Sequence, residues 1–281
     1  MNSATDLYLD LMKRCVLNYV YPEAEIEAER GARLPDRALN RARAVVARRF
    51  PSLMRDADMK MSRSPSFSVE GRSVGRDWPK YAHTMIGEKR LDSLRLLIED
   101  VIQHGVPGDL IETGVWRGGA TIFMRAVLAA HGVTNRVVYV ADSFGGLPKP
   151  DTKKYPQDAG DIDFMYEDLK VSLQQVQDNF RRYDLLDEQV QFIKGWFSET
   201  LPHASIERLA ILRLDGDMYG STMDALQSLY PKVSIGGYII VDDYGAIDRC
   251  RQAVEDYRAA HNIQDAIVPI DWTGVYWQRS S

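Results

Sequence analysis

The chain has 281 residues, of which 45% are hydrophobic and 27% are charged, and its formal net charge is −5. This apolar content excludes an intrinsically disordered protein, and no internal period indicates a repeat architecture. No apolar run approaches the roughly 20 residues of a membrane-spanning helix, and the two cysteines, Cys15 and Cys250, suggest neither a disulfide framework nor a zinc site. We therefore expect a cytoplasmic globular protein without a membrane partner.

Charge is distributed unevenly along the chain. Between Arg30 and Arg90 there are 15 Lys and Arg residues against 6 Asp and Glu. A basic stretch of this kind can bind nucleic acid or an anionic ligand. Many of these arginines, however, fit the solvent-facing side of a helix that begins after Pro35, and no stacking aromatic residues alternate with them. We expect no nucleic-acid partner.

Residues 1–80 are predicted to form an N-terminal helical appendage ahead of a main domain, residues 81–281. Thr5 can cap a first helix. The apolar stripe of this helix is expected to contain Leu7, Leu11, Val16 and Tyr19. A second helix is expected over residues 35–50. Residues 51–80 are rich in Ser, Arg, Gly and Met, which suits either a lid over a pocket or a solvated linker.

After Trp78 the pattern changes to strands that alternate with helices. An amphipathic helix is predicted at residues 88–103. Strands are predicted at residues 109–112, 136–141, 190–193, 208–214 and 238–241, helices at 119–131, 163–183, 221–229 and 247–261, and two closing strands near the end of the chain. Apolar runs such as VVYVA, LAILRL and YIIV suit strands buried on both faces of a parallel sheet. Five such β-α units predict a doubly wound α/β sheet.

In such a sheet, ligands bind beyond the carboxyl ends of the strands. The first strand is followed by ETGVWRGGA, whose glycines allow a sharp turn and a close approach to a ligand. The spacing lacks the G-x-G-x-x-G pattern of a dinucleotide site. Glu112, at the end of this strand, could receive a cationic amino group.

The next two strand ends suggest a nucleoside. Asp142 follows the second strand and could accept both hydroxyls of a ribose, although an acid here could also simply cap a turn. After the third strand, Gly195-Trp196-Phe197 places aromatic rings where an adenine would lie. Both rings could equally belong to the core.

The sharpest signal is a set of carboxylates at the tips of two neighbouring strands. They are Asp215, Asp217, Asp242 and Asp243. We expect them to repel one another strongly without a cation, and oxygen-only ligands favour Mg²⁺ over zinc. Adjacent strand residues point to opposite faces, so the chain must already turn at Asp242 and Asp243 for both to bind one ion. The alternative is that one or two of these acids cap the following helices.

Six sequence blocks, in this order, resemble the macrocin O-methyltransferase (TylF) family: ETGVWRGG, ADSFGGLP, KGWFSETLP, LRLDGDMYGST, GGYIIVDDY and DWTGVYW. The resemblance covers residues 78–278. Known members are bacterial enzymes that use S-adenosylmethionine and Mg²⁺ to methylate sugar hydroxyls on antibiotics. The resemblance implies a seven-stranded Rossmann-like methyltransferase sheet with an N-terminal appendage or lid. It also implies transfer of a methyl group to a sugar hydroxyl, with a vicinal diol favoured because two oxygens can replace two waters on the ion.

The resemblance also implies roles for individual residues. The cofactor-binding set is Thr84, Met85, Glu112, Thr113, Gly114, Gly118, Thr121, Asp142, Ser143, Phe144, Gly195, Trp196, Phe197 and Asp215. The metal ligands are Asp215, Asp242 and Asp243. Asp217 matches the general base proposed in the aminocoumarin branch, whereas macrolide enzymes use a histidine where this chain has Met218-Tyr219. The chain is therefore closer to the aminocoumarin noviose O-methyltransferases. Because members are often oligomeric, a homodimer is expected.

Two alternatives from other classes stay open at this point. Asp215-Gly-Asp217 also fits the D-x-D motif that holds a metal and a nucleotide diphosphate in glycosyltransferases, but this leaves Asp242 and Asp243 unexplained. The other alternative is a non-catalytic nucleotide-binding scaffold. Four clustered acids are costly to keep for structure alone, which speaks against a scaffold.

Overall fold

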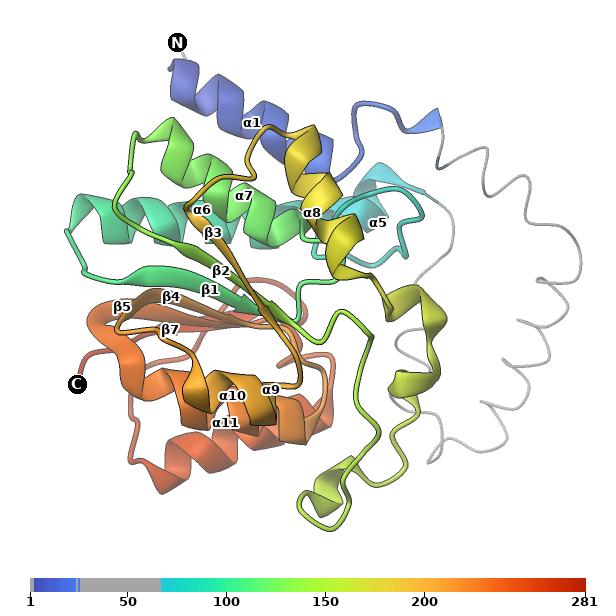
Figure 1. Ribbon diagram of the computed structural model, residues 1–281, viewed down its shortest axis with the longest axis vertical. Coiled ribbons are helices and arrows are strands. Elements are labelled where there is room, and N and C mark those ends of the chain that lie inside the picture. Colours follow the sequence, from blue (N-terminus) through green and yellow to red (C-terminus); the bar gives the residue numbers. More distant parts are fainter. Residues whose placement is uncertain (1–2, 24, 26–66) are drawn as a thin grey trace, which may run out of the picture.

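The computed structural model describes residues 3–23, 25 and 67–281, and its centre is one seven-stranded sheet (Figure 1). The strands are β1 (Asp109–Thr113), β2 (Val138–Asp142), β3 (Val190–Lys194), β4 (Leu209–Leu214), β5 (Val233–Val241), β6 (Val268–Pro269) and β7 (Val275–Gln278). Their order is β3-β2-β1-β4-β5-β7-β6. β1 to β5 are parallel, and β7 runs antiparallel to both β5 and β6. The predicted doubly wound α/β sheet is confirmed.

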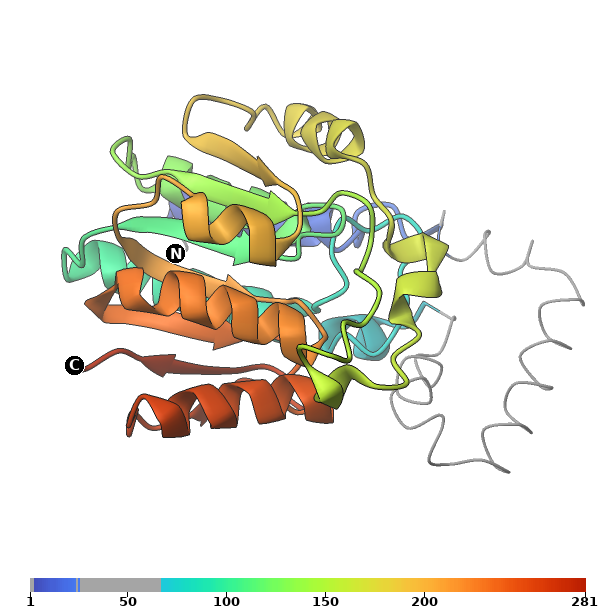
Figure 2. The same cartoon turned by 60° about the horizontal axis from the view of Figure 1, so that its bottom comes forward.

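Helices cover both faces of the sheet, as Figures 1 and 2 show. The helices are α1 (Ala4–Val16), α5 (Val69–Ser73), α6 (Glu88–Gln103), α7 (Gly119–Ala130), α8 (Leu173–Arg182), α9 (Phe197–Thr200), α10 (Tyr219–Leu229) and α11 (Asp248–Ala260). α1, α6, α7 and α8 lie on one side, and α9, α10 and α11 lie on the other. Among the described residues, no helix has the length and apolar character that crossing a membrane requires.

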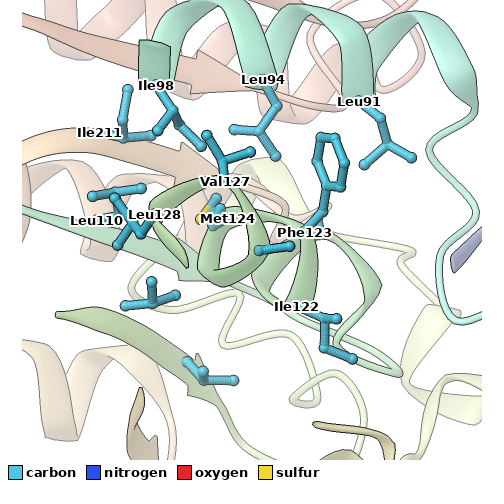
Figure 3. Close-up of a cluster of buried hydrophobic side chains, with 14 of the residues drawn as sticks. Leu91, Leu94, Ile98, Leu110, Ile122, Phe123, Met124, Val127, Leu128 and Ile211 are labelled. Atoms are coloured by element: carbon cyan, nitrogen blue, oxygen red, sulfur yellow. The ribbon is translucent and has the colours of Figure 1, made fainter. Parts of the chain in front are cut away.

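The larger hydrophobic core lies between the sheet, α6 and α7 (Figure 3). Leu91, Leu94 and Ile98 of α6 lie toward Phe123 and Val127 of α7. The predicted stripe of α6 is confirmed, since Leu91, Leu94, Leu97, Ile98 and Val101 are all buried. α7 is buried along nearly its whole length because it is covered by α1 and α6 as well as by the sheet.

The N-terminal helix presents a different face to the core from the one predicted. Leu9, Met12 and Val16 are buried, whereas Leu7 and Leu11 are 60% and 54% exposed. Both sets have helical spacing, and packing against α7 selects the first set. The cap also differs. Ser3, not Thr5, caps α1, and its side chain and that of Asp6 form a reciprocal capping box.

The helix predicted over residues 163–183 is shorter in the structure. α8 begins only after Ser172, which forms a capping box with Gln175. The preceding residues form short 3₁₀ turns at Asp163–Met165 and Glu167–Leu169. These turns belong to a long excursion between β2 and α8 that extends beyond the carboxyl ends of the strands (Figure 1).

Polar contacts hold the described part of the predicted appendage together and join it to the main fold. The helix predicted at residues 35–50, and residues 51–66 of the predicted lid, lie outside the described residues. In the described part, the buried Arg72 places Nε 2.5 Å from Asp77 Oδ2 and donates from Nη1 to the Leu17 carbonyl. Trp272 donates from Nε1 to the Val74 carbonyl at 2.7 Å. The division into residues 1–80 and 81–281 stays a prediction.

The corrected face of α1 can be tested by a matched pair of variants. Leu9→Ala should lower the free energy of unfolding by about 2–5 kcal/mol, because Leu9 is 1% exposed and its loss leaves a cavity. Leu11→Ala makes the same change on the exposed side and should shift it by less than about 0.5 kcal/mol. Equilibrium unfolding in urea measures both. Equal effects would contradict the packing of α1.

Candidate functional site

A cavity of about 280 Å³ lies beyond the carboxyl ends of the parallel strands. It is lined by residues at or after the carboxyl ends of β1, β2, β3, β4 and β5, together with the segment ahead of α6. The predicted site residues that line it are Thr84, Met85, Glu112, Gly114, Asp142, Ser143, Gly195, Trp196, Phe197, Asp215, Asp217, Asp242 and Asp243. The structure therefore brings most of the predicted set together.

Four residues predicted to bind the cofactor do not line this cavity: Thr113, Gly118, Thr121 and Phe144. The first three have local roles. Thr113 donates from Oγ1 to the Arg213 carbonyl at 3.5 Å, and Thr121 donates from Oγ1 to the Gly118 carbonyl at 2.9 Å. Phe144 packs its ring against that of Phe192. These residues support the loops that carry the site.

Two glycines allow the backbone to pack closely beneath the cavity. Gly114 has φ +87°, and a Cβ on it would lie 1.8 Å from the Asp215 carbonyl oxygen. A Cβ on Gly119 would lie 2.4 Å from the carbonyl oxygen of His83, which accepts the Gly119 amide at 2.8 Å. The glycine turn after β1 thus brings the end of β4 against the end of β1, and the Thr84 segment against the start of α7.

Asp142 connects two of the loops that surround the cavity. Its Oδ2 accepts the Val115 amide at 2.8 Å and its Oδ1 accepts the Phe144 amide at 2.7 Å. Burial raises the pKa of Asp142, and these backbone bonds oppose the rise. Asp142 therefore fulfils the turn-capping role considered for it, while it also lines the cavity. Its Oδ1 also accepts the Ser143 hydroxyl at 3.4 Å.

The carboxylates at the end of the sheet surround a buried arginine that the motif analysis did not include. Arg213 on β4 donates from Nη1 to Glu112 Oε1 and, at 2.9 Å, to Asp215 Oδ2. Its Nη2 donates to Asp242 Oδ1. A second buried arginine, Arg90 on α6, donates to the other oxygen of Asp242. The chain therefore supplies two of the positive charges that these carboxylates were expected to need.

The pKa values of this cluster depend on burial. Burial raises the pKa of Glu112 to about 8, and Arg213 opposes this rise. Burial and the neighbouring Asp242 raise the pKa of Asp215 to about 6. Burial lowers the pKa of Arg213, but Asp242, Glu112 and Asp215 outweigh it and leave the pKa above its ordinary value.

Asp215, Asp242 and Asp243 each place a carboxylate oxygen within 4.8 Å of the others. β5 ends at Val241 and the chain bends at the next two residues, as the prediction of a shared site required. α11 begins at Asp248, with Ile247 rather than Asp243 at its N-cap position. Asp217 lies in the left-handed region with φ +59°, which aspartate tolerates better than most residues.

Sequence patterns could have revealed both arginines. Arg213 lies between leucines in the fully buried run of β4, where an unpaired charge would be expensive. Arg90 falls on the buried stripe of α6, four residues before Leu94. Each is a charged residue at a position that periodicity assigns to the interior, which predicts a buried ion pair.

One wall of the cavity comes from the excursion between β2 and α8, which the motif analysis did not use. It includes Lys149, Lys154, Tyr155 and Asp158. Asp158 accepts the amides of Tyr219 at 2.8 Å and Gly220 at 2.8 Å. Met218, at the N-cap position of α10, provides no side-chain cap, so Asp158 caps this helix from a distant part of the chain. No local pattern predicts such a contact.

The parallel order, the ligand cavity at the strand ends and the antiparallel last strand define an α/β methyltransferase fold. Residues 5–279 match the family model described as Macrocin-O-methyltransferase (TylF). The chain belongs to this family and is an O-methyltransferase.

Named relatives agree with this assignment. The demethyldecarbamoylnovobiocin O-methyltransferase of Streptomyces niveus is 55% identical over 222 residues, which cover 78% of this chain and 84% of the relative. The mycinamicin III 3''-O-methyltransferase of Micromonospora griseorubida is 46% identical, covering 100% and 99%. A tetracenomycin-C 4'-O-methyltransferase of Streptomyces olivaceus, whose substrate carries a dimethoxy-rhamnosyl group, is 47% identical, covering 99% and 94%. The solved structure of the O-methyltransferase NovP superposes with a TM-score of 0.82 at 46% identity, covering 99% of this chain and 100% of that one.

The remote cap of α10 can be tested by mutation. Asp158→Ala should lower the free energy of unfolding by about 1–3 kcal/mol, because two buried amides lose their acceptor. Glu167→Ala, in the same excursion, removes a carboxylate whose side chain is 81% exposed and should change it by less than about 0.5 kcal/mol. Chemical denaturation followed by circular dichroism compares the two. An unchanged Asp158→Ala would contradict the capping role.

Proposed function

We propose that this enzyme transfers the methyl group of S-adenosylmethionine to a hydroxyl of a sugar on a secondary metabolite, with Mg²⁺ as cofactor. The charge of the cavity is the observation that carries the proposal. Among the described residues, nine Asp and Glu but only two Lys line it. Such a cavity favours positively charged ligands, and both the sulfonium cofactor and Mg²⁺ are positively charged.

The cavity contains a group suited to the amino end of the cofactor. Glu112 lines it, and its Oε2 is buried without a hydrogen-bond partner among the described residues. A buried oxygen of this kind is costly unless a donor reaches it, and an ammonium would supply one. Thr84, Met85 and Gly114 would lie around this end, Asp142 and Ser143 around the ribose, and Gly195, Trp196 and Phe197 around the adenine.

The residues present also fit a hard divalent cation. Asp215, Asp242 and Asp243 offer oxygen ligands alone, and such sets suit Mg²⁺. The two oxygens of Asp242 already accept arginine donors, yet each retains a lone pair. Bound Mg²⁺ would lower the pKa of a coordinated hydroxyl, and bound S-adenosylmethionine would supply an electrophilic methyl group.

The chain's own contributions are a proton acceptor and a fixed geometry. A sugar hydroxyl is a poor nucleophile near neutral pH because it holds its proton tightly. Asp217, which lines the cavity next to the metal-ligand group, would accept this proton as the oxygen takes the methyl group. Buried, paired carboxylates keep the reacting groups aligned without reorganisation.

The acceptor class is proposed from the relatives. Their names describe methylation of compounds related to novobiocin, mycinamicin and tetracenomycin C. A sugar with neighbouring hydroxyls on an antibiotic is therefore the acceptor that we propose. Trp78, in the described part of the predicted lid, lines the cavity. The lid and the division into residues 1–80 and 81–281 stay predictions. A homodimer and a cytoplasmic location stay predictions.

Cofactor binding can be tested directly by calorimetric titration. S-adenosylhomocysteine, the demethylated cofactor, should bind in the micromolar range, about −8 kcal/mol at 1 μM, because Glu112 can receive its ammonium. UDP, with or without Mg²⁺, should not bind. Metal-dependent binding of UDP without binding of S-adenosylhomocysteine would refute the proposal and support a D-x-D role for Asp215 and Asp217.

The role of Asp217 can be tested by kinetics. Asp217→Asn should lower kcat by about 10²–10⁴-fold at saturating Mg²⁺, because the amide cannot accept the proton. Its affinity for S-adenosylhomocysteine should stay close to that of the wild type. Asp224→Asn removes a charge from another wall of the same cavity, where Asp224 accepts the Tyr155 hydroxyl, and should retain most of the turnover. Near-normal turnover of Asp217→Asn would rule out the assignment.

A further inference from the structure

Arg213 is surrounded by groups that belong to both ends of the site. Its three carboxylate partners, Glu112, Asp215 and Asp242, all line the cavity, whereas Arg213 itself does not. The guanidinium therefore lies behind them. Both it and Glu112 are almost completely buried, which strengthens the bond between them.

The sheet geometry explains how one side chain reaches three carboxylates. Glu112 on β1 is the register partner of Arg213 on β4. Asp215 follows Arg213 by two residues and so lies toward the same face. Asp242 follows the last residue of β5, which is paired with Leu214. A planar guanidinium presents several N–H groups in fixed directions, and here two of its nitrogens serve three strands.

We propose that Arg213 is a positioning residue that orients the cofactor-binding carboxylate Glu112 and the metal-binding carboxylates Asp215 and Asp242 at the same time. Its Nη1 holds Oε1 of Glu112, while Oε2 of the same carboxylate is left without a hydrogen-bond partner among the described residues. The same nitrogen and its neighbour hold one oxygen each of Asp215 and Asp242. One substitution at this position should therefore weaken the binding of two chemically different ligands. The proposal rests on the proposed function, since it uses the same two ligands.

Arg90 provides a natural comparison. It is also a buried arginine bonded to Asp242, but its other carboxylate partner is Asp271, and within the described residues it forms no ion pair with Glu112. Arg90 therefore reaches the metal end only. The two arginines differ in the feature on which the proposal depends, the contact with the cofactor end.

The test is calorimetric titration of wild type, Arg213→Lys and Arg90→Lys with S-adenosylhomocysteine and, separately, with MgCl₂. Lysine keeps the positive charge but cannot bond three carboxylates in fixed directions. We expect Arg213→Lys to weaken both ligands by at least about tenfold, and Arg90→Lys to weaken Mg²⁺ while the affinity for S-adenosylhomocysteine stays within about twofold. Thermal unfolding and titration stoichiometry establish that each variant is folded.

The outcomes separate the two proposals. If wild type binds neither ligand, the proposed function fails. If wild type binds both and folded Arg213→Lys binds S-adenosylhomocysteine as tightly as wild type does, the positioning role of Arg213 is overturned. An equal loss of this affinity in Arg90→Lys would also overturn it, because the effect would then not require the contact with Glu112.

A second variant covers the case in which Arg213→Lys does not fold. Glu112→Gln keeps the shape of the side chain but weakens its bond to Arg213, and should alter the Mg²⁺ affinity by several fold although Glu112 is not a metal ligand. Asp142→Asn removes a charge from the same cavity without a bond to Arg213, and it controls for through-space electrostatics. Equal Mg²⁺ affinities in Glu112→Gln and Asp142→Asn would overturn the proposal.

Discussion

The burial of one positive charge at the middle of the sheet constrains both the fold and the site. Arg213 cannot lie in the interior of β4 without carboxylates around it, because an unpaired buried ion costs several kcal/mol. Its partners come from β1, from β4 itself and from the end of β5, so these strands must be adjacent and in the observed register. β1 and β4 are also the pair at which the strand order reverses, which is where doubly wound sheets bind ligands.

The arrangement of elements could be predicted because parallel strands buried on both faces appear as continuous apolar runs with few alternatives. Helix faces were less certain. In α1, Leu7 and Leu11 fit a buried stripe as well as Leu9, Met12 and Val16 do, and only contact with α7 distinguishes them. The start of α8 could have been predicted from nearby residues, since Ser172 and Gln175 have the spacing of a capping box. The predicted helix instead began too early, because the apolar pattern ahead of Ser172 was included in it.

The candidate site could be predicted where the order of the strands determines which residues lie together. Acids at the ends of neighbouring parallel strands must lie together, so Asp215, Asp242 and Asp243 could be grouped from the sequence alone. Contacts between residues that are far apart in the sequence could not be predicted. Asp158 reaches the first amides of α10 from a loop more than 60 residues earlier in the chain, and its own surroundings carry no sign of this. The general rule that buried charges require partners would have pointed to Arg90 and Arg213.

The charge balance of the cavity gives a physical reason to prefer methyl transfer over transfer of a sugar nucleotide. Arg213 and Arg90 neutralise only part of the acidic cluster, and Arg90 is shared with Asp271. Placing a diphosphate against the remaining carboxylates would add like charge in a weakly screened site. A cofactor with an ammonium and a sulfonium group, and a divalent cation, would instead reduce the repulsion. Burial and the neighbouring Asp242 raise the pKa of Asp215, so a bound cation would reduce an electrostatic cost that the same carboxylates create.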